Sequence, residues 1–137
     1  MALVFDVNVV ALVIGTVIAQ AIGAFWYSPL LFGNKWIKEM KFSKEEVKKM
    51  ENMSMAKPMF FNLLANLVLV YSIGVILASL GMTNAGLFPG LLLWVGLIAT
   101  SMLNSVLWEG RSFSMYLINI GHYLVVILAI CFTYAMV

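Results

Sequence analysis

The 137 residues of this chain are 64% hydrophobic and only 10% charged, with a mean hydropathy of +1.02. A soluble domain has about a quarter of its residues charged. The composition therefore excludes a soluble domain and predicts an integral membrane protein. The net charge of +2 is too small for a nucleic-acid-binding face, and no nucleic-acid partner is expected. One cysteine and one histidine are too few for a zinc site within the chain, and we expect no metal and no other cofactor.

Four apolar segments follow one another along the chain, at about 7–27, 58–80, 86–108 and 113–136. Each has roughly the 20 residues that a helix needs to cross the hydrocarbon core, and none contains Lys, Arg, Asp or Glu. Lipid offers no hydrogen-bond partner for the backbone, so a membrane-crossing segment that is not part of a closed barrel must be helical. The predicted fold is therefore all-α, an integral membrane four-helix bundle that forms a single transmembrane domain over residues 1–137.

The first span carries a small residue at every fourth position: Ala11, Gly15, Ala19 and Gly23. This spacing lines one helix face with small side chains and lets another helix approach closely. We expect the face to pack against a helix, and two partners stay open at this point: a helix of the same chain, or a helix of another copy or another protein.

The connection at 28–57 holds seven of the eight basic residues. Short loops rich in Lys and Arg stay in the cytoplasm, so this loop and the link after Trp108 are placed there, with both termini outside the cytoplasm. In a bacterium the chain would be a multi-pass protein of the inner membrane. An aromatic belt at the cytoplasmic interface agrees with this orientation: Phe25, Trp26, Tyr27, Phe32 and Trp36.

The same loop contains a capping-box pattern, in which Ser43 is followed by Glu46. The pattern predicts a short amphipathic helix over about 44–52. Two roles are open for this helix, a position on the membrane surface or a solvated connector between spans.

Polar side chains recur at one depth in all four spans. Given a rise of about 1.5 Å per residue, they lie roughly 6–14 Å below the cytoplasmic boundary: Gln20, Asn62, Asn66, Ser101, Asn104, Asn119 and His122. Because polar groups are costly in hydrocarbon, we expect them to converge. Two interpretations stay open, hydrogen bonding between helices and a solute pocket or permeation path open to the cytoplasm.

His122 is the only group within the spans that titrates near neutral pH. No carboxylate lies at its depth, and Glu109, at the end of the third span, is the nearest candidate partner. Glu109 and Arg111 can pair with each other or bind lipid headgroups. No catalytic residues are assigned, because Asp6 lies at the opposite membrane face from His122 and a Ser/His/Asp grouping cannot assemble.

Two stretches of the sequence resemble the signatures of a known family. Residues 23–36 read GAFWYSPLLFGNKW, and residues 108–111 and 116–123 read WEGR and YLINIGHY. Both resemble an uncharacterised bacterial membrane family, domain-of-unknown-function family 1761. That family usually has Gly-Tyr-His or Gly-Tyr where this chain has Gly-His-Tyr. The resemblance implies a stand-alone domain of four helices and no particular activity.

Three functions are compatible with these observations. The first is a homo-oligomeric protein that binds or conducts a small solute, or holds a lipid headgroup, in the polar layer. Small proton-coupled exchangers rely on a carboxylate within the membrane. The first span of this chain has Gln20 and no carboxylate, which argues against proton-coupled antiport. The second is a scaffold or accessory subunit whose small-residue face binds another membrane protein. The third is a lipid-modifying enzyme that uses Glu109 and His122.

Overall fold

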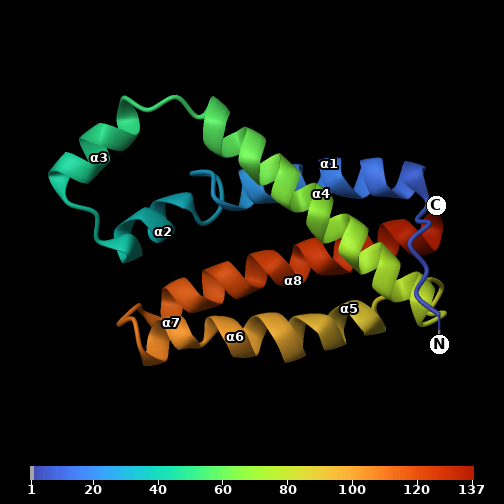
Figure 1. The fold of residues 1–137 in the computed structure, drawn as a ribbon. Coiled ribbons are helices and arrows are strands. Elements are labelled where there is room, and N and C mark those ends of the chain that lie inside the picture. The colour runs from blue at the N-terminus through green and yellow to red at the C-terminus, as the bar shows by residue number, and fades with distance from the viewer. Residues whose placement is uncertain (1) are drawn as a thin grey trace.

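The computed structural model describes residues 2–137, and its regular secondary structure over that range is entirely helical (Figure 1). Four stretches are long and apolar enough to cross a membrane: α1 (Val9–Trp26), α4 (Ala56–Ser79), the run Phe88–Leu107 and α8 (Phe113–Met136). The predicted all-α fold with four membrane-crossing helices is confirmed. The protein is therefore an integral membrane protein.

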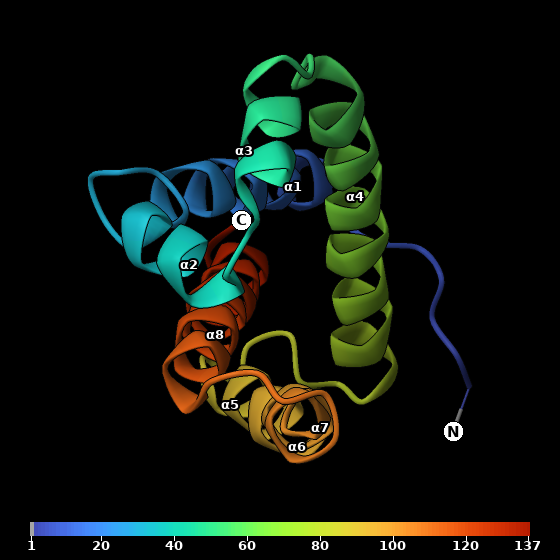
Figure 2. The ribbon, with the colours of Figure 1, turned by 90° about the vertical axis from the view of Figure 1, so that its left-hand side faces the viewer.

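The four spans alternate in direction, so their connections gather at two ends of the molecule. Both chain termini and the link from α4 to α5 lie at one end, which we call the terminal end (Figure 1). The loop between α1 and α4 and the link between α7 and α8 lie at the other, the lysine-rich end. Helices α1 and α8 lie side by side, α5 to α7 lie along α8, and α4 crosses α1 at an angle (Figures 1 and 2). Helix α8 thus contacts each of the other three spans.

The third span is not the single regular helix expected over 86–108. It consists of α5 (Phe88–Leu93), the π-helix η1 (Trp94–Ala99), α6 (Thr100–Met102) and α7 (Asn104–Leu107). Side chains supply partners to carbonyls in this irregular run. The Tyr116 hydroxyl of α8 donates to the Ala99 carbonyl at 2.6 Å, and Ser105 Oγ donates to the Met102 carbonyl at 2.9 Å. Irregular backbone at membrane depth is tolerated where protein groups satisfy it in this way.

The hydrophobic core lies between α1, α4 and α8, towards the terminal end. Val70 and Leu77 of α4 and Ile130 of α8 are among its fully buried side chains. Tyr134 of α8 is also buried there, and its hydroxyl donates to the Val70 carbonyl at 2.8 Å. Side chains from three spans interlock in this half of the bundle.

The small-residue face of α1 packs within the chain. Ala11, Gly15 and Ala19 are buried, and a Cβ added to Gly15 would come within 2.9 Å of Val70 Cγ1. Further along the same face, a Cβ added to Gly23 would lie 3.3 Å from His122 Nε2. The face therefore receives α4 and then α8 of the same molecule. Of the two partners considered for this face, a helix of the same chain is the one seen here.

The lysine-rich loop contains two short helices where the sequence predicted one. Helix α3 (Lys44–Glu51) has the expected capping box, in which Ser43 Oγ accepts from the Glu46 amide at 3.1 Å and Glu46 Oε1 accepts from the Ser43 amide at 3.3 Å. It buries no residue. Helix α2 (Gly33–Met40) was not predicted, and it lies against α8.

Candidate functional site

A tight turn after α1 fixes the aromatic residues at its end. The Phe32 amide donates to the Trp26 carbonyl at 3.0 Å, and the Gly33 amide donates to the Ser28 carbonyl at 2.9 Å. A side chain at Gly33 would collide with the backbone of Tyr27 and Ser28, so only glycine fits there. The turn therefore holds the end of α1 in one defined orientation.

From this turn, two side chains reach across to α8. Trp26 Nε1 donates to the Ile118 carbonyl at 2.9 Å, and the Tyr27 hydroxyl donates to Asn119 Oδ1 at 2.8 Å. From the third span, Trp94 Nε1 donates to the Ile120 carbonyl at 2.7 Å. The stretches 23–36 and 116–123, far apart in sequence, thus meet in space. The contact fixes the rotation of α8 at the depth of His122.

The predicted aromatic belt is thus only part of the role of Trp26 and Tyr27. Their hydrogen bonds to α8 were not predicted from the sequence, and neither Trp94 nor Tyr116 was predicted to bond a carbonyl of another span. A signal was present, because a tryptophan N–H or tyrosine O–H within a span needs an acceptor that lipid does not offer.

The ring of His122 is enclosed by other aromatic rings. Its centroid lies 5.2 Å from that of Tyr27, 4.9 Å from that of Tyr123 and 6.4 Å from that of Trp26. Both ring nitrogens are buried, and neither has a hydrogen-bond partner within residues 2–137. A buried donor without a partner costs about 1–3 kcal/mol, so this arrangement is unfavourable unless another group completes it.

His122 lines a cavity of about 420 Å³ between α1, α4 and α8, which we call the His122 cavity. Its polar lining consists of Gln20, Tyr27, Asn62, His122 and Tyr123, and Met55 and Met59 contribute thioether surface. None of its lining residues is charged. The chemistry available is hydrogen bonding by uncharged donors and acceptors beside an apolar wall.

Gln20 connects this cavity to α4. Its Oε1 accepts from Asn62 Nδ2 at 3.1 Å and from Asn66 Nδ2 at 2.7 Å, and its Nε2 donates to the Met59 carbonyl at 3.3 Å. Helix α4 buries no residue between its start and Leu69. Three hydrogen bonds to one side chain therefore hold the lysine-rich half of α4, in place of close packing.

A second cavity of about 330 Å³ lies between the end of the third span and α8. We call it the Arg111 cavity, and its polar lining comprises Ser101, Asn104, Ser105, Glu109, Arg111 and Asn119. Asn119 takes part in both regions, because its Oδ1 also accepts from Tyr27. The expected single polar layer is thus divided into two clusters that lie on either side of α8.

This division separates Glu109 from His122, because each lines a different cavity. The expectation that the two would act together, on which the lipid-modifying enzyme rested, has no support in the structure. Depth along the helices placed these residues together, but Asn119 lines the cavity of Glu109 whereas His122 lines the other.

Tyr27, just beyond the end of α1, is held in its neutral form. Burial of the phenol, with a smaller contribution from nearby Tyr123, raises the pKa of Tyr27 from 10.0 to about 12. Its hydroxyl is therefore protonated at neutral pH and donates to Asn119 throughout the physiological range.

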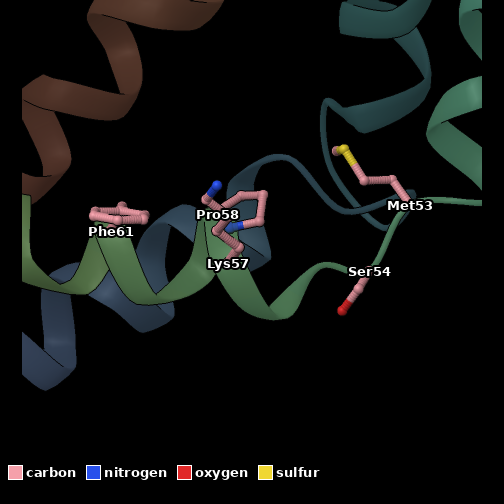
Figure 3. A pocket seen from close by; sticks show the side chains of 5 residues that line it. All are labelled: Met53, Ser54, Lys57, Pro58 and Phe61. Atoms are coloured by element: carbon pink, nitrogen blue, oxygen red, sulfur yellow. The ribbon is translucent and has the colours of Figure 1, made fainter.

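A third hollow, of about 430 Å³, lies at the start of α4 (Figure 3). Met53 and Phe61 lie at opposite sides of it, with Lys57 and Pro58 between them. Besides Lys57, Ser54 is the only polar residue that lines this hollow. This hollow is a surface feature of the connection and lacks the convergent polar groups of the other two cavities.

These features define a small polytopic membrane protein with two polar cavities at one end of a helical bundle. The chain belongs to the family described as Protein of unknown function (DUF1761), whose model matches residues 10–135. The match confirms the resemblance that residues 23–36, 108–111 and 116–123 indicated. No curated protein and no solved structure matches the chain.

Proposed function

We propose that the protein binds a small neutral solute in the His122 cavity. One observation carries the proposal: His122 lines this cavity, and both nitrogens of its ring are buried without a partner within residues 2–137. A solute that accepts from one ring nitrogen and donates to the other would remove the cost of the unpaired groups.

The lining indicates which solutes fit. It offers amide groups from Gln20 and Asn62, the hydroxyls of Tyr27 and Tyr123, and an imidazole, but no formal charge. A charged solute would have to leave water without a counter-charge, which is costly. The favoured class is therefore a small amide, urea or polyol, whose groups both donate and accept.

Solute binding in one copy does not by itself provide a path across the membrane. Towards the terminal end, the fully buried side chains of Val70, Leu77 and Ile130 close the bundle. Permeation would require either a movement of α4 or a path between subunits of a homo-oligomer. With the lysine-rich loop on the cytoplasmic side of a bacterial inner membrane, the cavity would open to the cytoplasm.

The test uses the full chain in lipid nanodiscs and measures solute contact by saturation-transfer NMR. The probes are urea, acetamide and glycerol, with acetate and methylammonium as charged controls. We expect binding of at least one neutral probe to wild type and its loss in His122→Phe, which keeps a ring of similar size. Asn104→Leu, a polar-to-apolar change outside this cavity, serves as the matched control and should still bind.

The same variant tests whether His122 is unpaired for a functional reason. Because His122→Phe removes two buried polar atoms that lack partners, it should raise the free energy of unfolding by about 1 kcal/mol while binding is lost. Thermal unfolding in detergent measures this change. A loss of stability, or unchanged binding of every probe, would contradict the proposal, as would a wild type that binds none of them.

A further inference from the structure

The Arg111 cavity differs from the His122 cavity in carrying charge of both signs. Glu109 and Arg111 are the only charged residues after Lys57 in the sequence. Both line the same cavity, together with the amides of Asn104 and Asn119 and the hydroxyls of Ser101 and Ser105. An anionic and a cationic side chain beside neutral donors form a complementary site for a ligand that itself carries both charges.

The backbone between the two charges holds them in this arrangement. Gly110 has φ +71°, a conformation that other residues rarely adopt, and it turns the chain between Glu109 and Arg111. The Arg111 amide then donates to the Ser105 carbonyl at 3.0 Å. The turn is thereby attached to the end of the third span, so both charges stay beside the cavity.

Asn119 adds a directed donor to this site. Its Oδ1 already accepts from the Tyr27 hydroxyl at 2.8 Å. The amide nitrogen of the same side chain remains to donate, and amide and guanidinium N–H groups together suit a phosphate oxygen.

The surroundings of the cavity indicate that the ligand comes from the lipid. Trp108, next to Glu109, is 83% exposed, and tryptophan settles at the headgroup level of a bilayer. Leu107 and Phe113, on either side of the charged turn, are 62% and 58% exposed. Because these two residues are the last of one membrane-crossing run and the first of the next, they lie at the edge of the hydrocarbon, and the charged turn between them lies where headgroups meet acyl chains.

We propose that the Arg111 cavity binds the zwitterionic headgroup of a phospholipid, with the phosphate at Arg111 and Asn119 and the ammonium at Glu109. An ethanolamine headgroup has the required chemistry, because its primary ammonium donates hydrogen bonds to a carboxylate. This site is separate from the His122 cavity, and the proposal does not depend on solute binding there.

The test offers the full chain an equimolar mixture of phosphatidylethanolamine and phosphatidylglycerol with matched acyl chains. Native mass spectrometry then measures the ratio of the two lipids retained. We expect wild type to retain the ethanolamine lipid about fivefold more, a ratio that one weak charge-assisted contact supplies. Glu109→Gln should bring the ratio close to one without loss of total lipid, because only the ammonium contact is removed.

Arg111→Gln should reduce retention of both lipids, because both carry the phosphate. Glu39→Gln and Lys38→Gln are the matched controls, since they remove the same charges from α2, outside the cavity. Both controls should keep the wild-type ratio. A ratio that is unchanged in Glu109→Gln, or a ratio that falls equally in Glu39→Gln, would overturn the proposal.

A second arm distinguishes a lipid from a free zwitterion. Soluble glycerophosphoethanolamine is added in excess to the protein with its lipid bound. We expect no displacement, because the acyl chains of the lipid contribute most of its retention. Displacement of the lipid in wild type, absent in Glu109→Gln, would overturn the assignment to a lipid and identify the ligand as a soluble zwitterion.

Discussion

The two halves of this bundle are held together by different means. In the terminal half, side chains of α1, α4 and α8 interlock, and Val70, Leu77 and Ile130 are fully buried. In the lysine-rich half, α4 buries nothing before Val70 and is attached to α1 through the side chain of Gln20. The His122 cavity and the Arg111 cavity lie in this second half, and a further polar cavity of about 360 Å³, lined by Asp6, Asn8, Thr83 and Asn84 among others, lies at the outer edge of the terminal half.

The difference shows two ways in which a membrane protein holds its helices together. Lipid tails are as apolar as leucine, so burial of apolar area alone does not drive helices together in a bilayer. Close approach at small residues such as Gly15 provides that attraction in the terminal half. The lysine-rich half replaces packing with a few hydrogen bonds, and the space that remains is polar.

The largest expected effect comes from filling the close contact in the terminal half. Gly15→Leu would drive a side chain into Val70 and separate α1 from α4. We expect the free energy of unfolding to fall by about 1–3 kcal/mol, the usual cost of overpacking. Unfolding in mixed micelles measures this loss.

The matched control for that change is Gly96→Leu. No atom lies within 4 Å of a Cβ added at Gly96, so the same side chain would extend into open space. A similar loss of stability in both variants would show that the packed half is not what holds the bundle.

A smaller and more local effect is expected from Gln20→Leu. This change removes all three hydrogen bonds between Gln20 and the lysine-rich half of α4. Each such bond contributes roughly 0.6–2 kcal/mol in a membrane, but no packed core is disturbed. Amide hydrogen exchange should therefore increase over residues 56–66 and stay unchanged over the terminal half of α4.

Tyr134→Phe is the counterpart of Gln20→Leu in the packed half. It removes the buried hydrogen bond to the Val70 carbonyl. Its effect should appear as a lower free energy of unfolding for the whole bundle, with no local rise in exchange. Uniform exchange changes in Gln20→Leu would contradict the contrast between the halves.

The smallest effect concerns pH. Because burial raises the pKa of Tyr27 to about 12 from 10.0, the folded state favours the neutral phenol. Stability from this group is present below pH 10 and is lost as pH rises from about 10 through about 12. Difference absorbance at 295 nm should show a late-titrating tyrosine signal that decreases by one tyrosine in Tyr27→Phe. If Tyr27→Phe instead removed a tyrosine that titrates near pH 10, the raised pKa of Tyr27 would be contradicted.

Local features were well predicted from the sequence. Helix α3 follows from Ser43 and Glu46, which bond to each other three residues apart. Helix α1 begins at Val9 rather than Val7, because Asn8 Oδ1 caps the amides of Val10 and Ala11. Helix α2, which is equally short, was missed because no side chain caps its first turn and its start therefore carries no capping pattern.

The sequence by itself determined that lipid surrounds this chain, that four helices cross it, and that polar side chains share one depth. Those conclusions depend on length, on the absence of charge within the spans and on the rise per residue, all of which are local. Only the tertiary structure decided that the small-residue face packs inside the molecule and that the polar layer divides around α8. Depth follows from position along a helix, whereas the direction in which Asn119 or His122 points depends on how tilted helices rotate against one another.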